Sequence, residues 1–251
     1  MFANYHTHTA RCRHASGADR EYVLSAIDSG VKILGFSDHA PFPHRAFVGM
    51  QPDELPEYVA SISALREEFR DDLQMHIGLE LEYDPKHFPR QLDFLKDHGI
   101  EYLILGQHAL FGLTDIAGAL MSGSEEKYLD YHCGLMKEAM DTGAITYVAH
   151  PDMYNFTGSK QVYEQHIRPL CRHAKDLDIP LEINLLGLRT NRHYPRPHFW
   201  QIAGEEGCKV ILGCDAHEPA SFLDEAGPNA AMALVKEYDL NLIKSAELHK
   251  L

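Results

Sequence analysis

The sequence predicts an α/β fold in which helices cover a parallel sheet, and three observations support this prediction. Seven short apolar runs typical of strands alternate with longer segments of helical periodicity. The links between them are short, as in strand–helix–strand units. The 251 residues contain no internal repeat, low-complexity run or linker, so we expect a single domain over residues 1–251.

The predicted elements alternate along the chain. Strands are expected at Asn4–His8, Lys32–Ser37, Met75–Tyr83, Tyr102–His108, Ile145–His150, Pro180–Asn184 and Lys209–Cys214. The helices include Pro52–Asp72, Glu125–Thr142, Gln161–Asp178 and Pro197–Glu206. Seven strands fit either an open doubly wound sheet or a barrel. No G-x-G-x-x-G motif follows the first strand, which argues against a dinucleotide-binding fold.

Composition limits the partners and the compartment. The net charge of −14 repels nucleic acid and anionic membranes, so the expected partner is a small molecule. The sequence has no membrane-length apolar stretch and begins without the pattern of a signal peptide. Its five cysteines are odd in number and show no C-x-x-C spacing, which favours a reduced, cytoplasmic protein. The oligomeric state is not predicted.

The ends of the predicted strands carry potential metal ligands. Histidine is the commonest metal ligand in proteins, and this chain has 17 histidines. In α/β barrels the functional residues lie where strands end and loops begin. Six of the seven predicted strands contain or run into such a ligand, namely His6 and His8, His39, Glu80, His108, His150, and Asp215 with His217. The pattern predicts that these side chains meet at one rim of the sheet.

Two pairs of ligands share the same spacing. His6 and His8 are two residues apart in a strand, so their side chains point to the same face. Asp215 and His217 repeat this geometry near the other end of the chain. A single H-x-H motif is more often two half-buried histidines with hydrogen-bond partners. Two such pairs at strand ends favour a metal site.

The remaining candidates carry weaker signals individually. His14 lies in a loop, where a histidine is usually exposed, and His39 and His150 could instead cap backbone groups in turns. Glu80 lies in an apolar run, where a carboxylate must be paired or bound to a metal because an isolated buried charge is costly. Glu82 shares the strand face of Glu80 and is the competing candidate.

Taken together, these motifs resemble the polymerase-and-histidinol-phosphatase (PHP) family. The resemblance covers most of the chain and rests on the order of H-x-H at 6–8, His14, S-D-H at 37–39, G-L-E at 78–80, G-x-H at 106–108, A-H-P at 149–151 and D-A-H at 215–217. It implies a distorted seven-stranded (β/α) barrel of the TIM type that holds up to three divalent ions. Imidazole and carboxylate ligands admit Zn, Mn or Fe.

The resemblance also implies how the ions are held. One ion would be bound by four residues, His6, His8, Glu80 and Asp215. Glu80 would bridge to a second ion, bound also by His108 and His150. A third ion would be bound by His14, His39 and His217. Residues Ile104–His108 depart from the G-S-V-H pattern of histidinol phosphatases, although the ligand itself is kept.

A second segment points to the substrate. Residues 182–189, followed by Tyr194-Pro195, resemble the E-I-N-x-x-G-x-R…Y-P segment of the histidinol-phosphatase branch. An arginine beyond a strand end offers a forked donor suited to phosphate oxygens. We expect Arg189 to bind the phosphate, with Arg192 as a second substrate contact and Arg196 as a competitor. His44, Arg45 and Tyr154 are further candidates for the rest of the substrate.

The expected reaction is the hydrolysis of L-histidinol phosphate, in histidine biosynthesis, to L-histidinol and phosphate. Three divalent ions would outweigh the charges of Glu80 and Asp215 and leave a positive pocket for a phosphate dianion. Hydroxide held between two ions would attack phosphorus, and Arg189 would stabilise charge on the phosphoryl oxygens. Asp215 and His217 are the candidate proton donors to the leaving group.

Three alternatives stay open. A general PHP phosphoesterase would keep the chemistry but act on another small phosphate or a nucleotide. A metal-dependent amidohydrolase also uses H-x-H on its first strand but usually adds a metal-bridging lysine, and no lysine here lies convincingly at a strand end. A metal-binding module without activity would bind ions but hydrolyse no phosphoester.

Overall fold

The computed structural model describes residues 1–41, 49–110, 122–249 and 251. Within these residues, the main sheet contains eight strands in the order β1-β2-β3-β4-β6-β8-β9-β10, and neighbouring strands are parallel. The strands are β1 Ala3–Asn4, β2 Ile33–His39, β3 Gln74–Leu81, β4 Tyr102–Leu105, β6 Ile145–Val148, β8 Leu181–Asn184, β9 Lys209–Gly213 and β10 Asn241–Leu242. Two further short strands, β5 Ser122–Gly123 and β7 Asn155–Phe156, pair with each other.

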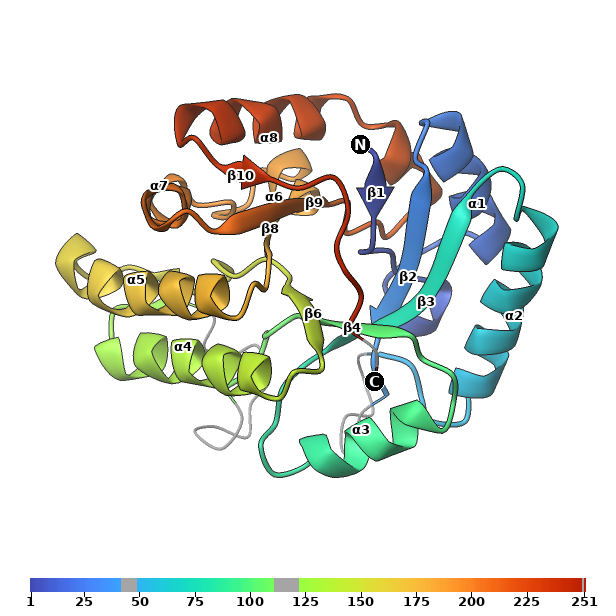
Figure 1. The fold of residues 1–251 in the computed structure, drawn as a ribbon, viewed down its shortest axis with the longest axis horizontal. Helices are drawn as coiled ribbons and strands as arrows, with labels where there is room; N and C mark the ends of the chain where they lie inside the picture. The colour runs from blue at the N-terminus through green and yellow to red at the C-terminus, as the bar shows by residue number, and fades with distance from the viewer. Residues whose placement is uncertain (42–48, 111–121, 250) are drawn as a thin grey trace.

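The helices surround the sheet on its outer face (Figure 1). They are α1 Asp19–Asp28, α2 Leu55–Glu68, α3 Phe88–Lys96, α4 Glu126–Asp141, α5 Lys160–Asp176, α6 Leu185–Arg189, α7 Pro197–Glu206 and α8 Ala226–Glu237, with 3₁₀ helices η1 Ala10–Cys12 and η2 Pro219–Leu223. Local chemistry sets several of their ends. The Ser159 side chain caps α5 by accepting from Val162 N, and Gly207 ends α7 in the left-handed conformation at φ 71°.

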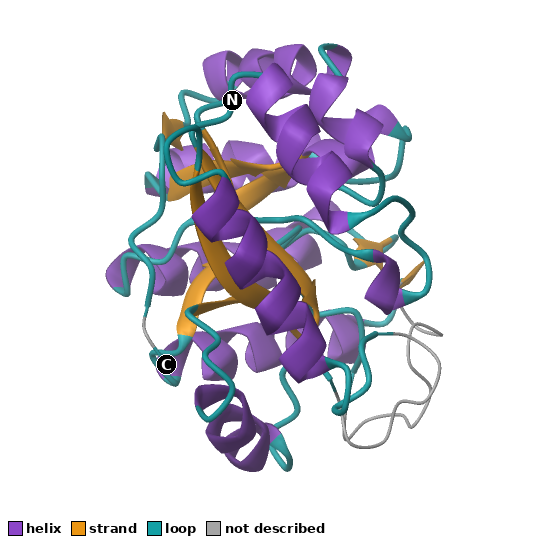
Figure 2. Ribbon diagram, turned by 90° about the vertical axis from the view of Figure 1, so that its right-hand side faces the viewer, coloured by secondary structure: helices purple, strands orange, loops and turns teal. Residues whose placement is uncertain are grey.

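The sheet curls into a distorted barrel whose first and later strands meet at one rim. Thr7, just after β1, forms a parallel bridge with Ala216, just after β9. The His8 N–H donates to the Ala216 carbonyl at 2.9 Å, and the Ala216 N–H donates to the His6 carbonyl at 3.2 Å. The ring is therefore closed at the rim where the strands end, and its curvature is visible from the side in Figure 2.

Two hydrophobic clusters hold the barrel together. The larger one lies between the strands and the surrounding helices. The smaller one fills the barrel interior with Ala3, Tyr5, Tyr102, Ile104, Tyr147, Ala149 and Ile211. The Tyr102 hydroxyl donates to the Tyr5 and Phe36 carbonyls at 2.8 and 3.0 Å, so its polar end is satisfied inside the core.

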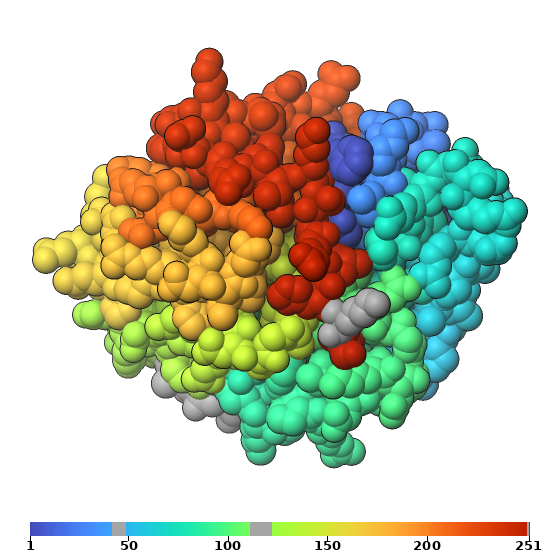
Figure 3. Space-filling view, in the orientation of Figure 1, coloured from blue at the N-terminus to red at the C-terminus, as the bar shows by residue number. Residues whose placement is uncertain are grey.

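The C-terminal segment covers the opposite end of the barrel. Ile243, Ala246 and Leu248 pack against the interior cluster, and the His249 N–H donates to Thr146 Oγ1 near the start of β6. In Figure 3 these last residues, in red, cross the middle of the face that is in view. The interior is therefore covered at the strand starts, and the strand ends remain for the functional site.

The predicted α/β barrel is confirmed, and each of the seven predicted strands contributes to the main sheet. The sequence prediction did not include β10, which is two residues long and pairs with β9. The first strand is shorter than expected, because the ladder with β2 ends at Asn4 while residues 6–8 turn toward Ala216. The predicted helix Pro197–Glu206 coincides with α7.

The five cysteines are free and buried. Among the residues that the structure describes, no helix has both the length and the apolar character needed to cross a bilayer.

Candidate metal centre

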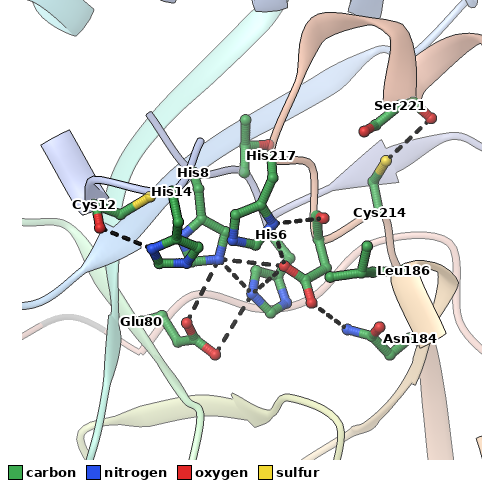
Figure 4. A network of polar contacts seen from close by, with 12 residues as sticks. His6, His8, Cys12, His14, Glu80, Asn184, Leu186, Cys214, His217 and Ser221 are labelled. Carbon is green, nitrogen blue, oxygen red and sulfur yellow. Dashed lines mark hydrogen bonds and ion pairs between the residues drawn. The ribbon is translucent and has the colours of Figure 1, made fainter. Parts of the chain in front are cut away.

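The nine predicted ligands converge at the rim where the strands end. They lie at or after the ends of strands β1, β2, β3, β4, β6 and β9. Stretches of chain more than 200 residues apart in sequence therefore meet in space, since His6 Nε2 lies 3.5 Å from Asp215 Oδ1. In Figure 4, His6, His8, His14 and His217 point toward one another, and Glu80 faces His8. Convergence of this donor set is what the strand-end pattern predicted.

Glu80 lies at the centre of the cluster. Its side chain is only 1 % exposed, and Gly106 on the neighbouring segment leaves the space that the carboxylate fills, since a Cβ there would overlap with Glu80. Histidine nitrogens surround both of its oxygens. Oε1 lies 2.9 Å from His150 Nε2, 3.6 Å from His6 Nε2 and 3.8 Å from His108 Nε2. Oε2 lies 2.9 Å from His39 Nδ1 and 3.5 Å from His8 Nε2. The two oxygens therefore face different groups of donors.

Asp215 faces the first histidine pair. Its Oδ1 lies 3.5 Å from His6 Nε2 and 3.3 Å from His8 Nε2, and the two Nε2 atoms are 3.2 Å apart. Its Oδ2 accepts from Asn184 Nδ2 at 3.0 Å, which fixes the orientation of the carboxylate. The His6, His8, Glu80 and Asp215 donors thus surround a common point.

The mouth of the site is lined by three more histidines. The ring of His217 stacks on that of His8 with centroids 4.1 Å apart, and His217 Nδ1 lies 3.2 Å from Asp215 Oδ1. The ring centroid of His14 lies 4.8 Å from that of His217 and 5.2 Å from that of His39. The loop histidine His14, the weakest candidate in the sequence, is therefore part of the cluster.

Glu182 was not singled out as a site residue from the sequence, yet it orients two members of the cluster. It is fully buried on β8, and its Oε1 lies 2.8 Å from His6 Nδ1. Its Oε2 accepts from the His150 backbone N–H at 3.0 Å and from Asn184 Nδ2 at 3.1 Å. Gly213 leaves room for this carboxylate, since a Cβ there would overlap with it. Glu182 thus directs His6 Nε2 toward Glu80 and Asp215.

Asp38 has a similar role beside His8. It is fully buried, its Oδ2 accepts from the Thr9 N–H at 3.2 Å and from the Thr9 hydroxyl, and its Oδ1 accepts from the His39 N–H at 2.7 Å. The same Oδ1 lies 3.6 Å from His8 Nδ1. The aspartate of the S-D-H motif therefore ties two histidine-bearing segments together.

Two of the cluster residues have unusual backbone conformations. His150 has φ 30° and Asp215 has φ 48°, both in the left-handed region that residues with a Cβ rarely adopt. Such conformations persist only where the surroundings enforce them, and they gather at functional sites. Here the Glu182 carboxylate holds the His150 N–H and Asn184 holds the Asp215 side chain.

The electrostatics of the cluster call for added positive charge. Glu80, Asp215, Glu182 and Asp38 are buried, and among the described residues no lysine or arginine lies within ion-pair distance of them. Burial alone lowers the pKa of His6, but the charges of Glu182, Asp215 and Glu80 outweigh burial and hold that pKa well above its ordinary value. The carboxylates therefore attract whatever cation the site can hold.

The donor atoms themselves fit divalent metal ions. Asp215 Oδ1 and Glu80 Oε2 are buried without a well-formed hydrogen bond, although each faces histidine nitrogens. The His6 and His8 Nε2 atoms approach each other to 3.2 Å, and a cation between them would use both lone pairs. Ligand atoms of His6, His8 and Glu80 all lie within 4.8 Å of one another. The same holds within two further groups: His6, His150 and Asp215 form one, and His8, His39 and His217 form the other.

The cluster forms the floor of a cavity of about 450 Å³. Glu82, Met153, Leu186, Arg192 and Tyr194 line it together with the histidines, Glu80 and Asp215. The guanidinium of Arg192 donates to the Tyr194 hydroxyl at 2.6 Å, so the two side chains brace each other at the rim. The cavity therefore offers room for a small substrate beside the donor cluster.

Arg189 stays a predicted phosphate contact, and the structure shows what surrounds its side chain. Arg189 ends the short helix α6, and its side chain does not line the cavity. Its guanidinium donates instead to the Cys214 carbonyl at 3.3 Å and lies 3.7 Å from Asp224. Among the described residues, Arg192, three residues later, is the arginine that lines the cavity. The competitor Arg196 is also turned away, since it donates to the Phe156 carbonyl and packs on Tyr163.

The other predicted substrate contacts divide into two groups. Tyr154 is buried at 2 % exposure next to His132 and does not line the cavity. His44 and Arg45 lie outside the described residues. Glu82, the competitor of Glu80, lies at the rim, where its Oε1 is 3.6 Å from His108 Nδ1.

Comparison with known proteins agrees with this architecture. The family profile described as "PHP domain" matches residues 4–185, which include seven of the nine predicted ligands. A protein named "Probable histidinol-phosphatase" from Deinococcus radiodurans is 32 % identical over 232 residues, which cover 85 % of each chain. The protein named "Histidinol-phosphatase" from Bacillus subtilis is 24 % identical over 249 residues, covering 85 % of this chain and 92 % of the relative.

A solved structure shares the fold along nearly the whole chain. The crystal structure of histidinol phosphate phosphatase from Lactococcus lactis, complexed with zinc, L-histidinol and phosphate, superposes with a TM-score of 0.77 at 19 % identity and 98 % coverage of both chains. This likeness shows the fold, and the family profile together with the Deinococcus relative shows the kinship. The chain belongs to the PHP family, in the branch of its histidinol-phosphatase members.

Proposed function

We propose that this chain is a metal-dependent histidinol-phosphatase, which hydrolyses L-histidinol phosphate to L-histidinol and phosphate. The observation that supports this most directly is the convergence of six histidines, Glu80 and Asp215 on one cavity, with Arg192 at the rim and His6 beside Glu80 and Asp215. Relatives across most of the chain length are named for this activity. The cavity of about 450 Å³ suits a small phosphomonoester.

The arrangement of donors supports up to three divalent ions, of which zinc is the one present in the Lactococcus structure. Glu80 would be suited to bridge two ions, because its Oε1 faces His6, His108 and His150 while its Oε2 faces His8 and His39. We assign the first ion to His6, His8, Glu80 and Asp215, the second to Glu80, His108 and His150, and the third to His14, His39 and His217. Bound ions would supply positive charge that polarises the phosphoryl group and acidifies water.

The protein's own groups complete the chemistry. Hydrolysis breaks the bond between phosphorus and the ester oxygen, forms a new bond from phosphorus to water oxygen, and moves one proton to the leaving alkoxide. Arg192 is placed to donate to phosphoryl oxygens, as a forked guanidinium does. Asp215 and His217 lie 3.2 Å apart and both line the cavity, so they are the candidates for passing the proton to the alkoxide. Glu182 and Asp38 keep the histidines in place.

Two alternatives differ in the substrate. A general phosphoesterase would use the same donors, and some relatives carry only the name "Probable phosphatase", as in Shewanella halifaxensis at 24 % identity. A metal-dependent amidohydrolase would use a metal-bridging lysine, and no lysine is among the described residues that line the cavity. The donor set and Arg192 favour phosphate chemistry over amide hydrolysis.

The test is a comparison of substrates with the purified full chain. Turnover of L-histidinol phosphate is compared with that of other small phosphomonoesters and a nucleotide, by kcat/KM in one buffer with one added metal, alongside metal analysis of the protein. We expect a clear preference for L-histidinol phosphate and loss of turnover after chelation. Equal kcat/KM for all of the phosphates would support the general phosphoesterase, and no hydrolysis by a metal-loaded protein would refute both.

A further inference from the structure

Glu82 is the third carboxylate among the described residues that line the cavity, and it differs from the other two in position. Glu80 and Asp215 lie at the floor, with side chains 1 % and 5 % exposed, while the Glu82 side chain is 14 % exposed at the rim. Glu82 directly follows the end of β3, and it lines the same cavity as Glu80. The two glutamates face opposite nitrogens of one ring, with Glu80 Oε1 3.8 Å from His108 Nε2 and Glu82 Oε1 3.6 Å from His108 Nδ1.

The charges that line the cavity therefore differ between its floor and its rim. The floor is the place of the proposed ions and attracts a phosphate, and Arg192 adds a positive group at the rim. The negative charge of Glu82 is unfavourable for the phosphate itself. It is favourable for a substrate that carries a cationic group a short distance from its phosphate, because the two ends then face opposite charges.

We propose that Glu82 is a specificity-determining residue that binds the ammonium group of an amino-alcohol phosphate. The inference rests on the proposed function and names the feature of the substrate that the site selects. In L-histidinol phosphate the amine is on the carbon next to the phosphate-bearing carbon, so its two charges are close together. The floor carboxylate Glu80 and the rim carboxylate Glu82 are likewise close, on the two nitrogens of the His108 ring. A carboxylate has about four lone-pair sites, so Glu82 accepts an ammonium N–H in addition to its other contacts.

A different role for Glu82 makes a different prediction. Its Oε1 lies 3.6 Å from His108 Nδ1, so it could instead orient His108, as carboxylates beside metal-bound histidines do. A residue that only orients His108 affects every substrate and the metal content alike. A residue that binds the amine affects only substrates that carry one.

The experiment compares two substrates on the metal-loaded full chain and on Glu82→Gln. The substrates are L-histidinol phosphate and 3-(imidazol-4-yl)propyl phosphate, which is the same molecule without the amine. For Glu82→Gln we expect kcat/KM to fall by about 10- to 100-fold with the amine-bearing substrate, as for a lost charged hydrogen bond, and to change little with the other. Metal content should be unchanged, and Glu205→Gln, at an exposed carboxylate paired with Arg168, should behave as the parent chain.

The outcomes separate this inference from the proposed function. Equal loss with both substrates, or loss of bound metal in Glu82→Gln, would show that Glu82 positions His108 and would overturn the inference. No loss with either substrate would overturn it as well. If the parent chain already hydrolyses both compounds with equal kcat/KM, the amine is not recognised and the inference fails while the phosphatase assignment stands. If the parent chain hydrolyses neither, the proposed function itself fails.

Discussion

Replacing Glu182 with Gln should weaken metal binding although Glu182 is not itself a proposed ligand. The carboxylate accepts from three donors: His6 Nδ1 at 2.8 Å, the His150 N–H at 3.0 Å and Asn184 Nδ2 at 3.1 Å. Glutamine has nearly the same shape but places an NH₂ group on one side. If this NH₂ group faced His6, it would donate to Nδ1. The ring proton would then have to be on Nε2, which is the nitrogen directed at Glu80 and Asp215.

The opposite orientation of the amide is no better. The NH₂ group would then face the His150 N–H and the Asn184 amide, which are both donors. Either way at least one charge-assisted hydrogen bond is lost, which costs about 1.5 to 3 kcal/mol. Since about 1.4 kcal/mol corresponds to a factor of ten, the expected loss in metal affinity is about 10- to 100-fold, the range found for groups that support metal ligands.

Competition with a chelator measures this effect directly. The metal-free parent chain, Glu182→Gln and the matched control Glu205→Gln are titrated with Zn²⁺ against a chelator of known affinity. The melting temperature of each metal-free protein shows whether it is folded. A folded Glu182→Gln protein that binds zinc as tightly as the parent would refute the argument that this carboxylate sets the orientation of His6.

Three further predictions follow from the same geometry. Glu80→Gln should abolish turnover and reduce the number of bound ions, measured by metal analysis, because both carboxylate oxygens face ligand histidines; a variant with full metal content and activity would contradict this. Arg192→Ala should lower kcat/KM for L-histidinol phosphate by about 10- to 100-fold, as expected for a lost charged hydrogen bond. Arg189→Ala should mainly lower the melting temperature, because the Arg189 guanidinium donates to the Cys214 carbonyl. The reverse pattern would identify Arg189 as the phosphate ligand. Burial lowers the pKa values of His6 and His8, but neighbouring carboxylates outweigh it and raise both pKa values well above the ordinary value. The two Nε2 atoms lie 3.2 Å apart, so without metal the pair shares a proton that zinc must displace. Apparent zinc affinity should therefore rise with pH and binding should release protons, and a pH-independent affinity would contradict this.

The fold was predictable because strand-like runs and helical periodicity were both regular. The seven predicted strands contribute to the sheet in chain order. What escaped prediction depends on tertiary contacts. The two-residue β10 carries no strand pattern of its own and is defined by its pairing with Lys209 and Val210. Residues 6–8 leave the expected strand because the backbone of His6 and His8 bonds to Ala216, a partner more than 200 residues away in sequence.

The candidate site was predictable to the extent that strand ends place side chains. The rule that functional residues follow strand ends brought eight residues to one rim, and the family resemblance added His14. It could not predict side-chain direction on the short helix α6, where Arg189 turns toward Asp224. Glu182 was not predicted as a site residue, although the sequence carried a signal for it. It is a carboxylate between Leu181 and Ile183 in an apolar run. The cost of burying an isolated charge, which identified Glu80, applies to Glu182 equally.

The central claim is that residues from distant parts of the chain form one centre for divalent ions around Glu80. Anomalous diffraction from crystals grown with Zn²⁺ or Mn²⁺ tests it most directly, because it locates each ion and identifies the element. We predict peaks between Glu80 and its neighbours His6, His39 and His150. Crystals that contain the metal only at other positions, or none beside Glu80 at saturating metal, would contradict the account.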